Sequence, residues 1–587
     1  MCGIAGIFRT DGVSPAPARL DGLADSLGHR GPDGRGRYVK GPVGLVHTRL
    51  AIIDLETGDQ PLLHPNGCVL IANGEIYNYV ELREALPGAV FRTRSDCEPL
   101  LHLYAKEGLG FVGRLRGMYG LALYDPTEER LVLARDPFGI KPLYYAETAE
   151  GFVFASEPQA LIKSGCVAPN LRPQSQRELL QLQFTTGAET IFEGIRRVLP
   201  GELLVVEKGR LTHRQRLAAL PEGAPQPMAE AEALDRLETA LRGSVEVHQR
   251  SDVPYGLFFS GGIDSSAILA LMAELNERPV AAFTAGFPDT RAKDERDHAR
   301  ALAGTVGAEF VEVEFTENDF WRHLPEIVAA MDDPAADYAI LPTWKLAAQA
   351  SHGLKVVLCG EGGDEIFGGY GRYRSAMRPA WLGGRRLRTR GVFDGLGVLR
   401  AAPKGWRDGL AAAEAASLSG GRTRLQAAQA LDCADWLPND LLTKLDRCLM
   451  IHGVEGRTPF LDREVAAAAF RLPDDLKVRG GLGKWALRKW LAGKLPSAKP
   501  FSEKRGFTVP VAEWISRQGT RLGPLVAARP AIRELCAAGA VEDLFRAREK
   551  RAGFAAWLLL FYALWHRRHV EGLEDRGDVF EILGQRP

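Results

Sequence analysis

The second residue of the chain, Cys2, is placed where its own backbone amine can take part in chemistry. If Met1 is removed, Cys2 carries both a thiol and a free α-amino group. The pKa of an α-amine is about 7.7–8.0, so part of it is neutral at pH 7 and can act as a base. A nucleophile paired with its own terminal amine needs no separate histidine. A cysteine that serves as a small hydrophobic residue is the alternative interpretation.

Polar residues in the next part of the chain could bind an amino-acid amide. Arg49 could hold a carboxylate through two parallel hydrogen bonds, and Asp96 could hold an ammonium group. The Asn73 side chain and the backbone N–H of Gly74 could stabilise the oxyanion of a tetrahedral intermediate. Taken one at a time, these residues are more often turn or cap residues, because Gly, Asn and Asp are common in turns.

A glycine-rich loop near the middle of the chain has the composition of a phosphate-binding loop. Residues 260–266 read SGGIDSS and lie between an apolar run and a helical pattern. Small residues let several backbone N–H groups face one anion, and the following helix adds about half a positive charge. Asp264 could bind a Mg²⁺ that bridges phosphates. The loop has no Lys of the Walker A type, and an ordinary strand-to-helix turn is the alternative.

A second loop of glycines and acids, CGEGGDE at residues 359–365, follows the apolar run KVVL. Ligands of open parallel sheets bind at the carboxyl ends of the strands, where both loops are expected to lie. Asp364 is a second candidate Mg²⁺ ligand. Glu361 could accept a proton from attacking ammonia as a general base. A cap on the next helix is the alternative role for Glu361.

The elements that must position the first group of residues are mostly short strands. Gly, Pro and Asp clusters separate β-like runs at 3–8, 43–47, 69–72, 121–124, 131–134 and 152–155. Helical patterns interrupt them at 17–27, 79–86 and 97–106. This grouping predicts an α+β domain in which sheets pack with helical layers.

The pattern changes after a stretch rich in Pro and Ala at residues 217–230. Strand patterns at 253–259, 280–287, 310–315 and 355–358 alternate with helical patterns at 264–275, 294–306 and 341–350. This alternation predicts a parallel sheet covered on both faces, followed by a mostly helical part. We therefore predict one domain at residues 1–215, a linker at 216–231 and a second domain at 232–587.

Composition and charge exclude several classes of partner. Lys+Arg and Asp+Glu each total 74, so no global field favours nucleic acid or an anionic membrane. The 8 cysteines are scattered without a CxxC pair, which favours a reducing compartment over disulfides or zinc. The N-terminus has no signal-peptide pattern, and the apolar run at 554–565 is shorter than the roughly 20 residues of a membrane span. We expect a cytoplasmic protein, and the sequence allows a homodimer.

Five motifs in the first domain resemble the glutaminase domain of class II glutamine amidotransferases. They are MCGIAGIF, HRGPD, the Arg49 loop, NGEIYN and SDCE, in this order. The resemblance implies an N-terminal-nucleophile hydrolase with a four-layer αββα fold. It implies that Cys2 is the nucleophile, that its α-amine is the base, and that Asn73 and Gly74 form the oxyanion hole. The glutamine-binding residues that it implies are Arg49, Asn73, Glu75 and Asp96.

Four motifs in the second domain, SGGIDSS, GEGGDEIFGGY, GVEGRTPFLD and GKWALR, resemble the synthetase domain of glutamine-hydrolysing asparagine synthase. The first resembles the SGGxDS loop of ATP pyrophosphatases, which release AMP. The resemblance implies an α/β fold like that of adenine nucleotide alpha hydrolases, with ATP as a substrate and Mg²⁺ at Asp264 and Asp364. It places Arg457 near the active site. The implied ATP-binding residues are Leu257, Ser260, Gly261, Gly262, Asp264, Ser265, Ser266, Ala285, Cys359, Gly360 and Lys484.

The resemblance is weaker where the acceptor is expected to bind. The best-understood asparagine synthases carry a Thr-Thr-Ile-Arg-type run there, whereas residues 332–342 read DDPAADYAILP, without an Arg. Ala or Tyr cannot replace an Arg that grips a carboxylate unless a new partner is present. Aspartate therefore stands beside other acceptors, such as a sugar acid of a cell-surface polysaccharide or a secondary metabolite. The basic run Arg385, Arg386, Arg388 and Arg390 is expected to be a solvated loop, with a patch for an anionic acceptor as the alternative.

The predicted reaction joins two half-reactions. Cys2 releases ammonia from glutamine through a thioester, and MgATP converts the acceptor into an acyl-adenylate and diphosphate. Ammonia then crosses a tunnel and attacks the adenylate, protected from water. With aspartate as acceptor, the products are AMP, diphosphate, L-asparagine and L-glutamate. Intact Cys2, Asn73, Asp264 and Asp364 argue against a non-catalytic nitrogen-sensing or scaffold protein, and the SGGIDSS loop argues against an aminosugar-forming enzyme.

Overall fold

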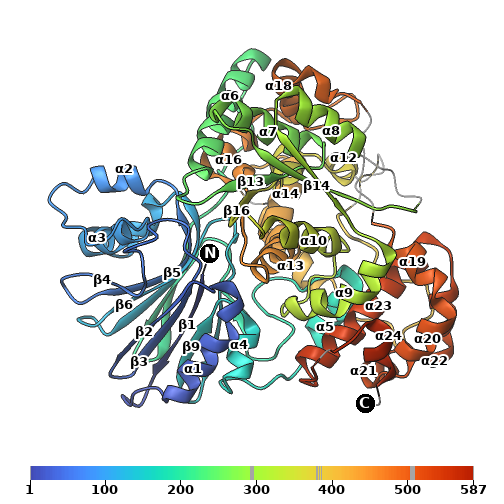
Figure 1. Cartoon of the computed structure of the whole chain (residues 1–587), viewed down its shortest axis with the longest axis horizontal. Helices are drawn as coiled ribbons and strands as arrows, with labels where there is room; N and C mark the ends of the chain where they lie inside the picture. Colours follow the sequence, from blue (N-terminus) through green and yellow to red (C-terminus); the bar gives the residue numbers. More distant parts are fainter. Residues whose placement is uncertain are drawn as a thin grey trace.

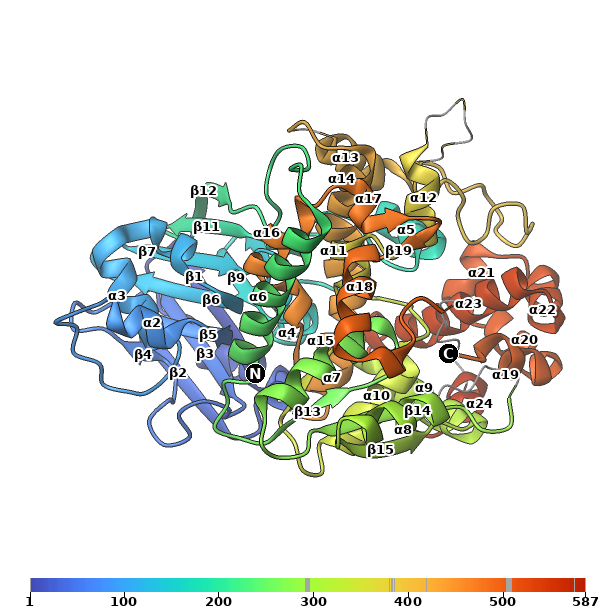
Figure 2. The ribbon, with the colours of Figure 1, turned by 90° about the horizontal axis from the view of Figure 1, so that it is seen from above.

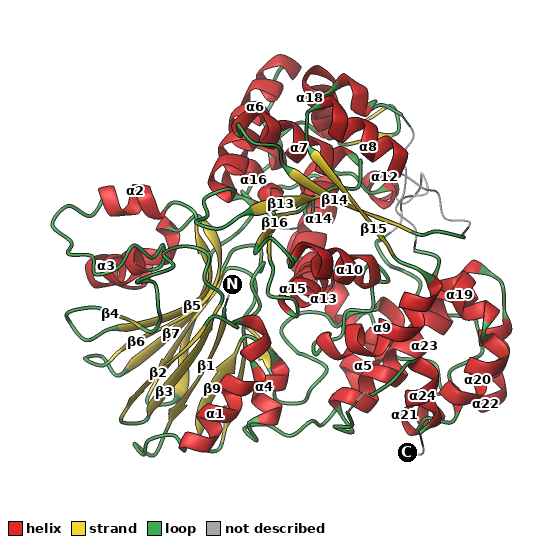
Figure 3. Ribbon diagram, in the orientation of Figure 1, coloured by secondary structure: helices red, strands yellow, loops and turns green. Residues whose placement is uncertain are grey.

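Two different halves of the chain lie side by side in the computed structural model, and the N-terminus lies at the junction between them (Figure 1). The structure describes residues 2–290, 296–378, 381, 384, 386–418, 420–502, 509–574 and 576–585. Strands dominate the first half and helices the second (Figure 3). Seen from above, the first half forms one end of the molecule and helices from the last part of the chain form the other (Figure 2).

The first half contains two six-stranded antiparallel sheets. The first sheet has the order β10 (Arg196–Arg197), β8 (Tyr144–Thr148), β9 (Gly151–Ala155), β1 (Gly3–Arg9), β3 (Val43–Arg49) and β2 (Gly34–Lys40). The second has the order β12 (Arg210–Arg216), β11 (Glu202–Glu207), β7 (Arg130–Arg135), β6 (Gly117–Asp125), β5 (Val69–Ile76) and β4 (Leu62–Leu63).

The two sheets pack face to face between helices. Successive side chains of a strand point to opposite faces, so Ile4 and Phe8 enter the core between the sheets while Ala5 and Ile7 pack towards α1. Helices α1 (Pro17–Ser26) and α4 (Pro158–Lys163) cover the first sheet, and α2 (Tyr79–Glu84) and α3 (Glu98–Glu107) cover the second (Figure 3). The predicted four-layer αββα sandwich is confirmed.

The second half is built on a five-stranded sheet in which every pairing is parallel. Its order is β15 (Glu309–Glu314), β14 (Ala281–Gly286), β13 (Tyr255–Phe258), β16 (Val356–Leu358) and β17 (Glu455–Arg457). β13 has its sequence successor β14 on one side and β16 on the other, so the strand order reverses beside it. Such a reversal is where open α/β sheets bind ligands. The predicted parallel sheet is confirmed.

Helices cover both faces of this sheet. One face carries α9 (Glu317–Ala330), α10 (Ile340–Ala350) and α15 (Leu442–Met450), and the other carries α6 (Glu230–His248), α7 (Ile263–Leu275), α8 (Arg296–Thr305) and α18 (Trp485–Lys494). A π-helical segment, Asp432–Leu441, runs directly into α15. β12 ends at Arg216 and α6 begins at Glu230, with neither helix nor strand between them.

The remaining helices surround this α/β unit. They are α5 (Pro173–Leu182), α11 (Gly363–Phe367), α12 (Gly371–Met377), α13 (Asp408–Ser417), α14 (Arg424–Leu431), α16 (Arg463–Phe470), α17 (Asp474–Lys477), α19 (Val511–Arg517), α20 (Gly519–Ala527), α21 (Pro530–Leu535), α22 (Ala538–Arg546), α23 (Lys550–His569) and α24 (Val579–Gly584). The apolar run at 554–565 lies in α23, where Trp557 and Trp565 are fully buried. Within the described ranges, no helix has the length and apolar character needed to cross a membrane.

Candidate active sites

The backbone of Cys2 bridges the two sheets of the sandwich. Gly3 of β1 pairs with Thr48 of β3, so Cys2 lies opposite Arg49 at the end of this register. The Cys2 backbone N donates to Asn73 Oδ1 in the other sheet at 3.1 Å. Asn73 Nδ2 is buried and has no hydrogen-bond partner among the residues that the structure describes. An unused buried donor is costly, and here it is available to a developing oxyanion beside the thiol.

Gly74 occupies a position where only glycine fits. The short apolar run at 69–72 predicted a strand that ends before Asn73. Strand β5 instead continues through Asn73, Gly74 and Glu75. A Cβ atom on Gly74 would lie 2.1 Å from the Met118 carbonyl oxygen of β6. Glycine at this position therefore lets β5 and β6 approach closely beside Asn73.

An acidic cluster surrounds the space beside Cys2. Glu75 Oε2 lies 3.5 Å from Arg457 Nη2, and Arg457 Nε donates to Glu455 Oε1 at 2.6 Å. Asp96 accepts a hydrogen bond from the backbone N–H of Ile76 at 2.8 Å. Two of the three carboxylates contact the one guanidinium, and the excess of negative charge suits the ammonium group of an amino acid. Helix α3 begins at Glu98, so Asp96 lies in the turn just before this helix.

Burial and like charges shift the protonation equilibria of this cluster. Burial, together with the Glu455 and Asp96 carboxylates, holds the pKa of Glu75 well above its usual value. Burial also raises the pKa of Asp96 and of the Cys2 thiol. Burial acts against ionisation of Glu455 as well, but the Arg457 guanidinium holds the pKa of Glu455 at about 2. A bound ammonium would favour the ionised forms of Glu75 and Asp96.

Arg49 lies at the exposed edge of the same site. Its Nη1 donates to Asp59 Oδ1 at 2.8 Å, and its Nη2 donates to the carbonyl oxygens of Ile53 and Asp54. The Asp59 side chain is 81% exposed whereas that of Arg49 is 8% exposed. Backbone carbonyl groups hold the Arg49 guanidinium in place, and the Asp59 carboxylate on it faces solvent. A substrate carboxylate could therefore replace that of Asp59.

Sequence reasoning assigned no role to Arg30, which is fully buried beside Cys2. Arg30 Nε donates to the Cys2 carbonyl oxygen at 3.1 Å, and Arg30 Nη1 and Nη2 donate to Asp446 of α15 at 2.7 and 2.9 Å. Arg30 also donates to Glu157 at 2.7 Å. The Asp446 carboxylate accepts from Arg447 Nη1 at 2.8 Å. Through Arg30, this buried network ties the carbonyl group of Cys2 to helix α15 of the second half.

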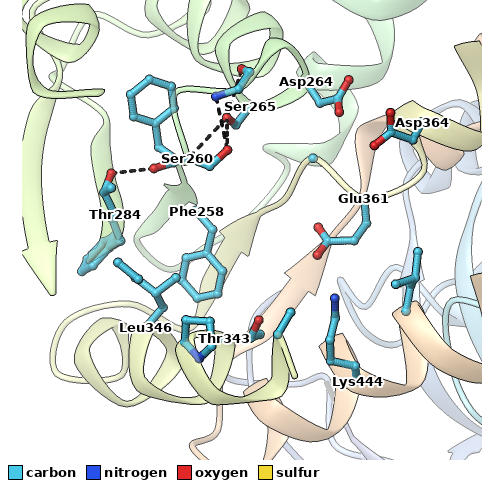
Figure 4. Close-up of a pocket in the computed structure, with 18 of the residues that line it drawn as sticks. Phe258, Ser260, Asp264, Ser265, Thr284, Thr343, Leu346, Glu361, Asp364 and Lys444 are labelled. Atoms are coloured by element: carbon cyan, nitrogen blue, oxygen red, sulfur yellow. Dashed lines mark hydrogen bonds between the residues drawn. The ribbon is translucent and has the colours of Figure 1, made fainter. Parts of the chain in front are cut away.

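The second candidate site begins with the loop after β13. Gly261 has a φ of +69°, a conformation that favours glycine, and Gly262 is the N-cap of α7. The Gly262 backbone N–H donates to Ser260 Oγ at 3.2 Å, and the Ser260 and Ser265 Oγ atoms are 3.2 Å apart (Figure 4). The loop is therefore fixed by its own hydroxyl groups, with the N-terminus of α7 at its end.

The loop after β16 touches this first loop because the two strands are neighbours. A Cβ atom on Gly363 would lie 2.6 Å from Asp264 Oδ1, so the loops can approach only because residue 363 is glycine. Lys484, the N-cap of α18, places its Nζ 2.5 Å from Asp264 Oδ2 and 2.7 Å from Asp364 Oδ1. One cation thus contacts both of the carboxylates that the sequence indicated as metal ligands.

The donor set at these carboxylates fits Mg²⁺ only with help from another ligand. Oxygen atoms of Asp264 and Asp364 converge on one ammonium, and hard oxygen ligands are those that Mg²⁺ prefers. Throughout the described part of the chain, no group of three or more His, Cys, Asp or Glu side chains could hold a metal ion. Phosphate oxygens and water would have to complete the coordination, as is usual for Mg²⁺ bound with a nucleotide.

A cavity of about 360 Å³ opens between the two loops and α10 (Figure 4). Of the predicted nucleotide-binding residues, it is lined by Ser260, Gly262, Asp264, Ser265, Ala285 and Gly360. Leu257, Ser266 and Cys359 are buried beneath the loops. Gly261 lies within the first loop, and Lys484 reaches the site through Asp264 and Asp364. Glu361 and Asp364 also line the cavity, and burial raises the pKa of Glu361.

One strand reaches both candidate sites. The side chain of Arg457 in β17 points to Glu75 of the first site, while its carbonyl oxygen accepts from the Cys359 N–H at 2.8 Å, next to the second. Lys141, from the first half, donates to the Gly456 carbonyl oxygen of the same strand at 3.3 Å. Strand β17 therefore connects the surroundings of the two sites.

Sequence comparisons match both halves of the chain to known families. The sequence model of the asparagine synthase family matches residues 236–567, and that of the glutamine amidotransferase domain matches residues 1–217. The chain belongs to the asparagine synthase family. Members of this family are ligases that use glutamine as the amide donor and ATP as a substrate. The chain is accordingly an amidotransferase ligase.

Several curated relatives in the family share much of the chain. Asparagine synthetase [glutamine-hydrolyzing] 1 of Bacillus subtilis is 32% identical over 567 residues, covering 88% of each chain. Asparagine synthetase [glutamine-hydrolyzing] 2 of the same organism is 30% identical and covers 84% of this chain and 70% of its own. A protein named amidase chyE, of Penicillium rubens, is 32% identical over 61% of this chain and 56% of its own.

Within this family member, the Asp-Pro-rich segment mainly joins the two halves. Asp333 accepts from Arg197 Nη2 at 2.7 Å and from the Tyr144 hydroxyl at 2.8 Å, both in the first half. Asp332 accepts from Arg447 Nε at 2.7 Å. Further along the segment, Asp337 accepts from Lys444 Nζ at 3.2 Å.

The basic run that offered a patch for an anionic acceptor is partly directed inward. Arg388 Nη1 donates to the fully buried Asp432 at 2.9 Å, so this residue is not solvated as we expected. Arg385 lies outside the described residues. A buried ion pair of this kind leaves Arg388 committed to Asp432 and unsuited to a surface patch.

Proposed function

We propose that the chain catalyses the glutamine-hydrolysing asparagine synthase reaction. In this reaction ATP, L-aspartate, L-glutamine and water give AMP, diphosphate, L-asparagine and L-glutamate. The observation that carries the proposal is the position of β17, which contacts the Glu75 cluster through the Arg457 side chain and the Cys359 loop through the Arg457 carbonyl group. Nitrogen released at the first site is thereby close to the second.

For the first half-reaction, the proposed roles follow from the contacts around Cys2. Residues 1–215 form the glutaminase unit. The Cys2 thiol, deprotonated by the α-amine, attacks the amide carbon; the C–S bond forms, the C–N bond breaks, and ammonia leaves with the proton. Asn73 Nδ2 and the Gly74 N–H stabilise the oxyanion. Arg49 holds the substrate carboxylate, and Glu75 and Asp96 hold its ammonium group. Water then releases glutamate from the thioester.

For the second half-reaction, residues 232–587 form the synthetase unit, joined by the linker at 216–231. The Ser260–Ser266 loop holds the phosphates at the N-terminus of α7. Asp264 and Asp364 would hold a Mg²⁺, which when bound neutralises phosphate charge. Lys484 lies beside both carboxylates, where its positive charge can stabilise the negative charge of the departing diphosphate. Glu361 accepts the proton that ammonia loses as the new C–N bond forms.

The acceptor is tested by a panel of acids scored for diphosphate release. The panel contains aspartate, glutamate, a uronic acid and a simple monocarboxylate, each with ATP and either glutamine or ammonium. We expect aspartate to give the highest kcat/KM and one AMP for each asparagine. Turnover of a uronic acid in preference to aspartate would overturn the acceptor assignment and leave the amidotransferase chemistry in place.

A further inference from the structure

The wall of the second cavity opposite the phosphate loops is formed by α10 and α15. Most of its lining side chains are apolar or weakly polar: Ala339, Pro342, Thr343, Leu346 and Leu441. Lys444 carries the one basic side chain among the described residues that line the cavity, and it is only 6% exposed. The Lys444 ammonium and the Glu361 carboxylate point into the same space (Figure 4). A buried ammonium group needs anionic or polar partners for its three donors.

Carboxylates behind Lys444 hold it in this position. Lys444 Nζ donates to Asp337 Oδ2 at 3.2 Å, and an ammonium group has two further donors. Asp440, one turn earlier in the chain, accepts from Trp436 Nε1 at 2.7 Å, and its Oδ1 is buried without a hydrogen-bond partner in the described part of the structure. Despite its burial, Lys444 has a raised pKa because Asp337, Glu361 and Asp440 lie close to it. The lysine therefore stays charged.

We propose that Lys444 binds the second, non-reacting carboxylate of the acceptor, which makes the acceptor a short dicarboxylate. This inference rests on the proposed function, because it takes the second cavity as the site of acyl-adenylate formation. One carboxylate of the acceptor lies towards the phosphate loop and Glu361, while the other lies on Lys444. Lys444 thereby fills the role left open by the missing Arg in residues 332–342. A monocarboxylate, such as a uronic acid, would offer no second carboxylate to the two Lys444 donors that Asp337 does not use.

The test compares aspartate with β-alanine, which has the same reacting carboxyl and amine but no second carboxylate. The wild-type enzyme should prefer aspartate in ammonia-dependent AMP formation. In Lys444→Met, kcat/KM for aspartate should fall by at least about 30-fold, as expected when one partner of a buried charge pair is removed. The value for β-alanine should stay within about threefold, so the preference collapses. A merely structural role of Lys444 would lower both substrates equally.

Three further variants keep the result interpretable. Lys345→Met is the matched control, because Lys345 of α10 pairs with Asp319 at 3.0 Å away from the cavity lining; it should keep the wild-type preference. Lys444→Met with Asp337→Asn removes both partners, which guards against misfolding from an unpaired buried carboxylate, and should show the same collapse. Lys444→Arg should recover part of the preference. Glutaminase activity without ATP reports that the first half of each variant is folded, and AMP formation with β-alanine reports the same of the second half.

Two outcomes would overturn the proposal, and they differ from failure of the proposed function. If Lys444→Met retains the wild-type preference for aspartate over β-alanine, Lys444 does not bind the second carboxylate, although aspartate remains the acceptor. If the wild-type enzyme uses a monocarboxylate as well as aspartate, the dicarboxylate class is wrong. Turnover of a monocarboxylate alone would remove both this inference and the aspartate assignment.

Discussion

Cys2→Ala is expected to abolish glutamine-dependent synthesis and to leave ammonia-dependent synthesis intact. Removal of a nucleophile from a preorganised site costs at least about 10⁴-fold in kcat, because the remaining groups have no covalent intermediate to stabilise. The second cavity, which lies beyond β17, keeps its phosphate loops and Glu361 unchanged. Glutamate release and AMP formation should be measured in the same samples, with glutamine or ammonium as the nitrogen source.

The matched control for this variant is Cys166→Ala. Cys166 lies in the same half of the chain and is partly exposed, while Cys2 is buried. It should keep both activities close to wild type. A Cys2→Ala enzyme that still releases glutamate from glutamine at the wild-type rate would show that another residue is the nucleophile.

Asp264→Asn should have the second large effect, and it should act on the other half-reaction. Asn keeps the size of the side chain but removes the charge that Lys484 neutralises and that a divalent cation would need. We expect AMP formation to fall by about 100- to 1,000-fold with either nitrogen source, as when a preorganised electrostatic group is removed. Glutamine hydrolysis without ATP should be unchanged.

Asp297→Asn is the control for this substitution. Asp297 lies on α8 with a side chain that is 99% exposed, paired only at the surface with Arg300 at 2.9 Å. It should retain full diphosphate release, because exposed pairs contribute little. If Asp264→Asn made AMP at the wild-type rate, neither the cation site nor the loop contact with Lys484 would matter for ATP activation.

The parts of the fold that could be predicted are those with a clear hydrophobic period. The αββα sandwich and the parallel sheet follow from short apolar runs and from the alternation of strand and helix. Strands β2 and β12 were missed because their sequences, GRGRYVK and RLTHRQR, are charged. Both lie at the edge of a sheet, where charged side chains protect against further pairing. Helix α9 was missed although Thr316 and Asp319 form a capping box, since Pro325 interrupts its pattern.

The parts of the sites that could be predicted are contiguous in the sequence. The SGGIDSS and GEGGDE loops carry their own signature, and strand order brings them together. Arg30, Lys444 and Glu455 could not be found in this way, because each acts through contacts between segments that are far apart in the chain. Lys444, for instance, lies in an otherwise ordinary amphipathic helix. Only the packing of α15 against α10 directs its side chain towards the cavity.

The account depends centrally on activation of the acceptor carboxylate by adenylation. The most direct measurement uses aspartate labelled with ¹⁸O in its side-chain carboxylate, with ATP and glutamine, and analyses the nucleotide product by mass spectrometry. Attack of that carboxylate on the α-phosphorus followed by attack of ammonia must leave one ¹⁸O atom in AMP and an unlabelled diphosphate. Formation of ADP with ¹⁸O in inorganic phosphate, or of AMP without label, would contradict the account.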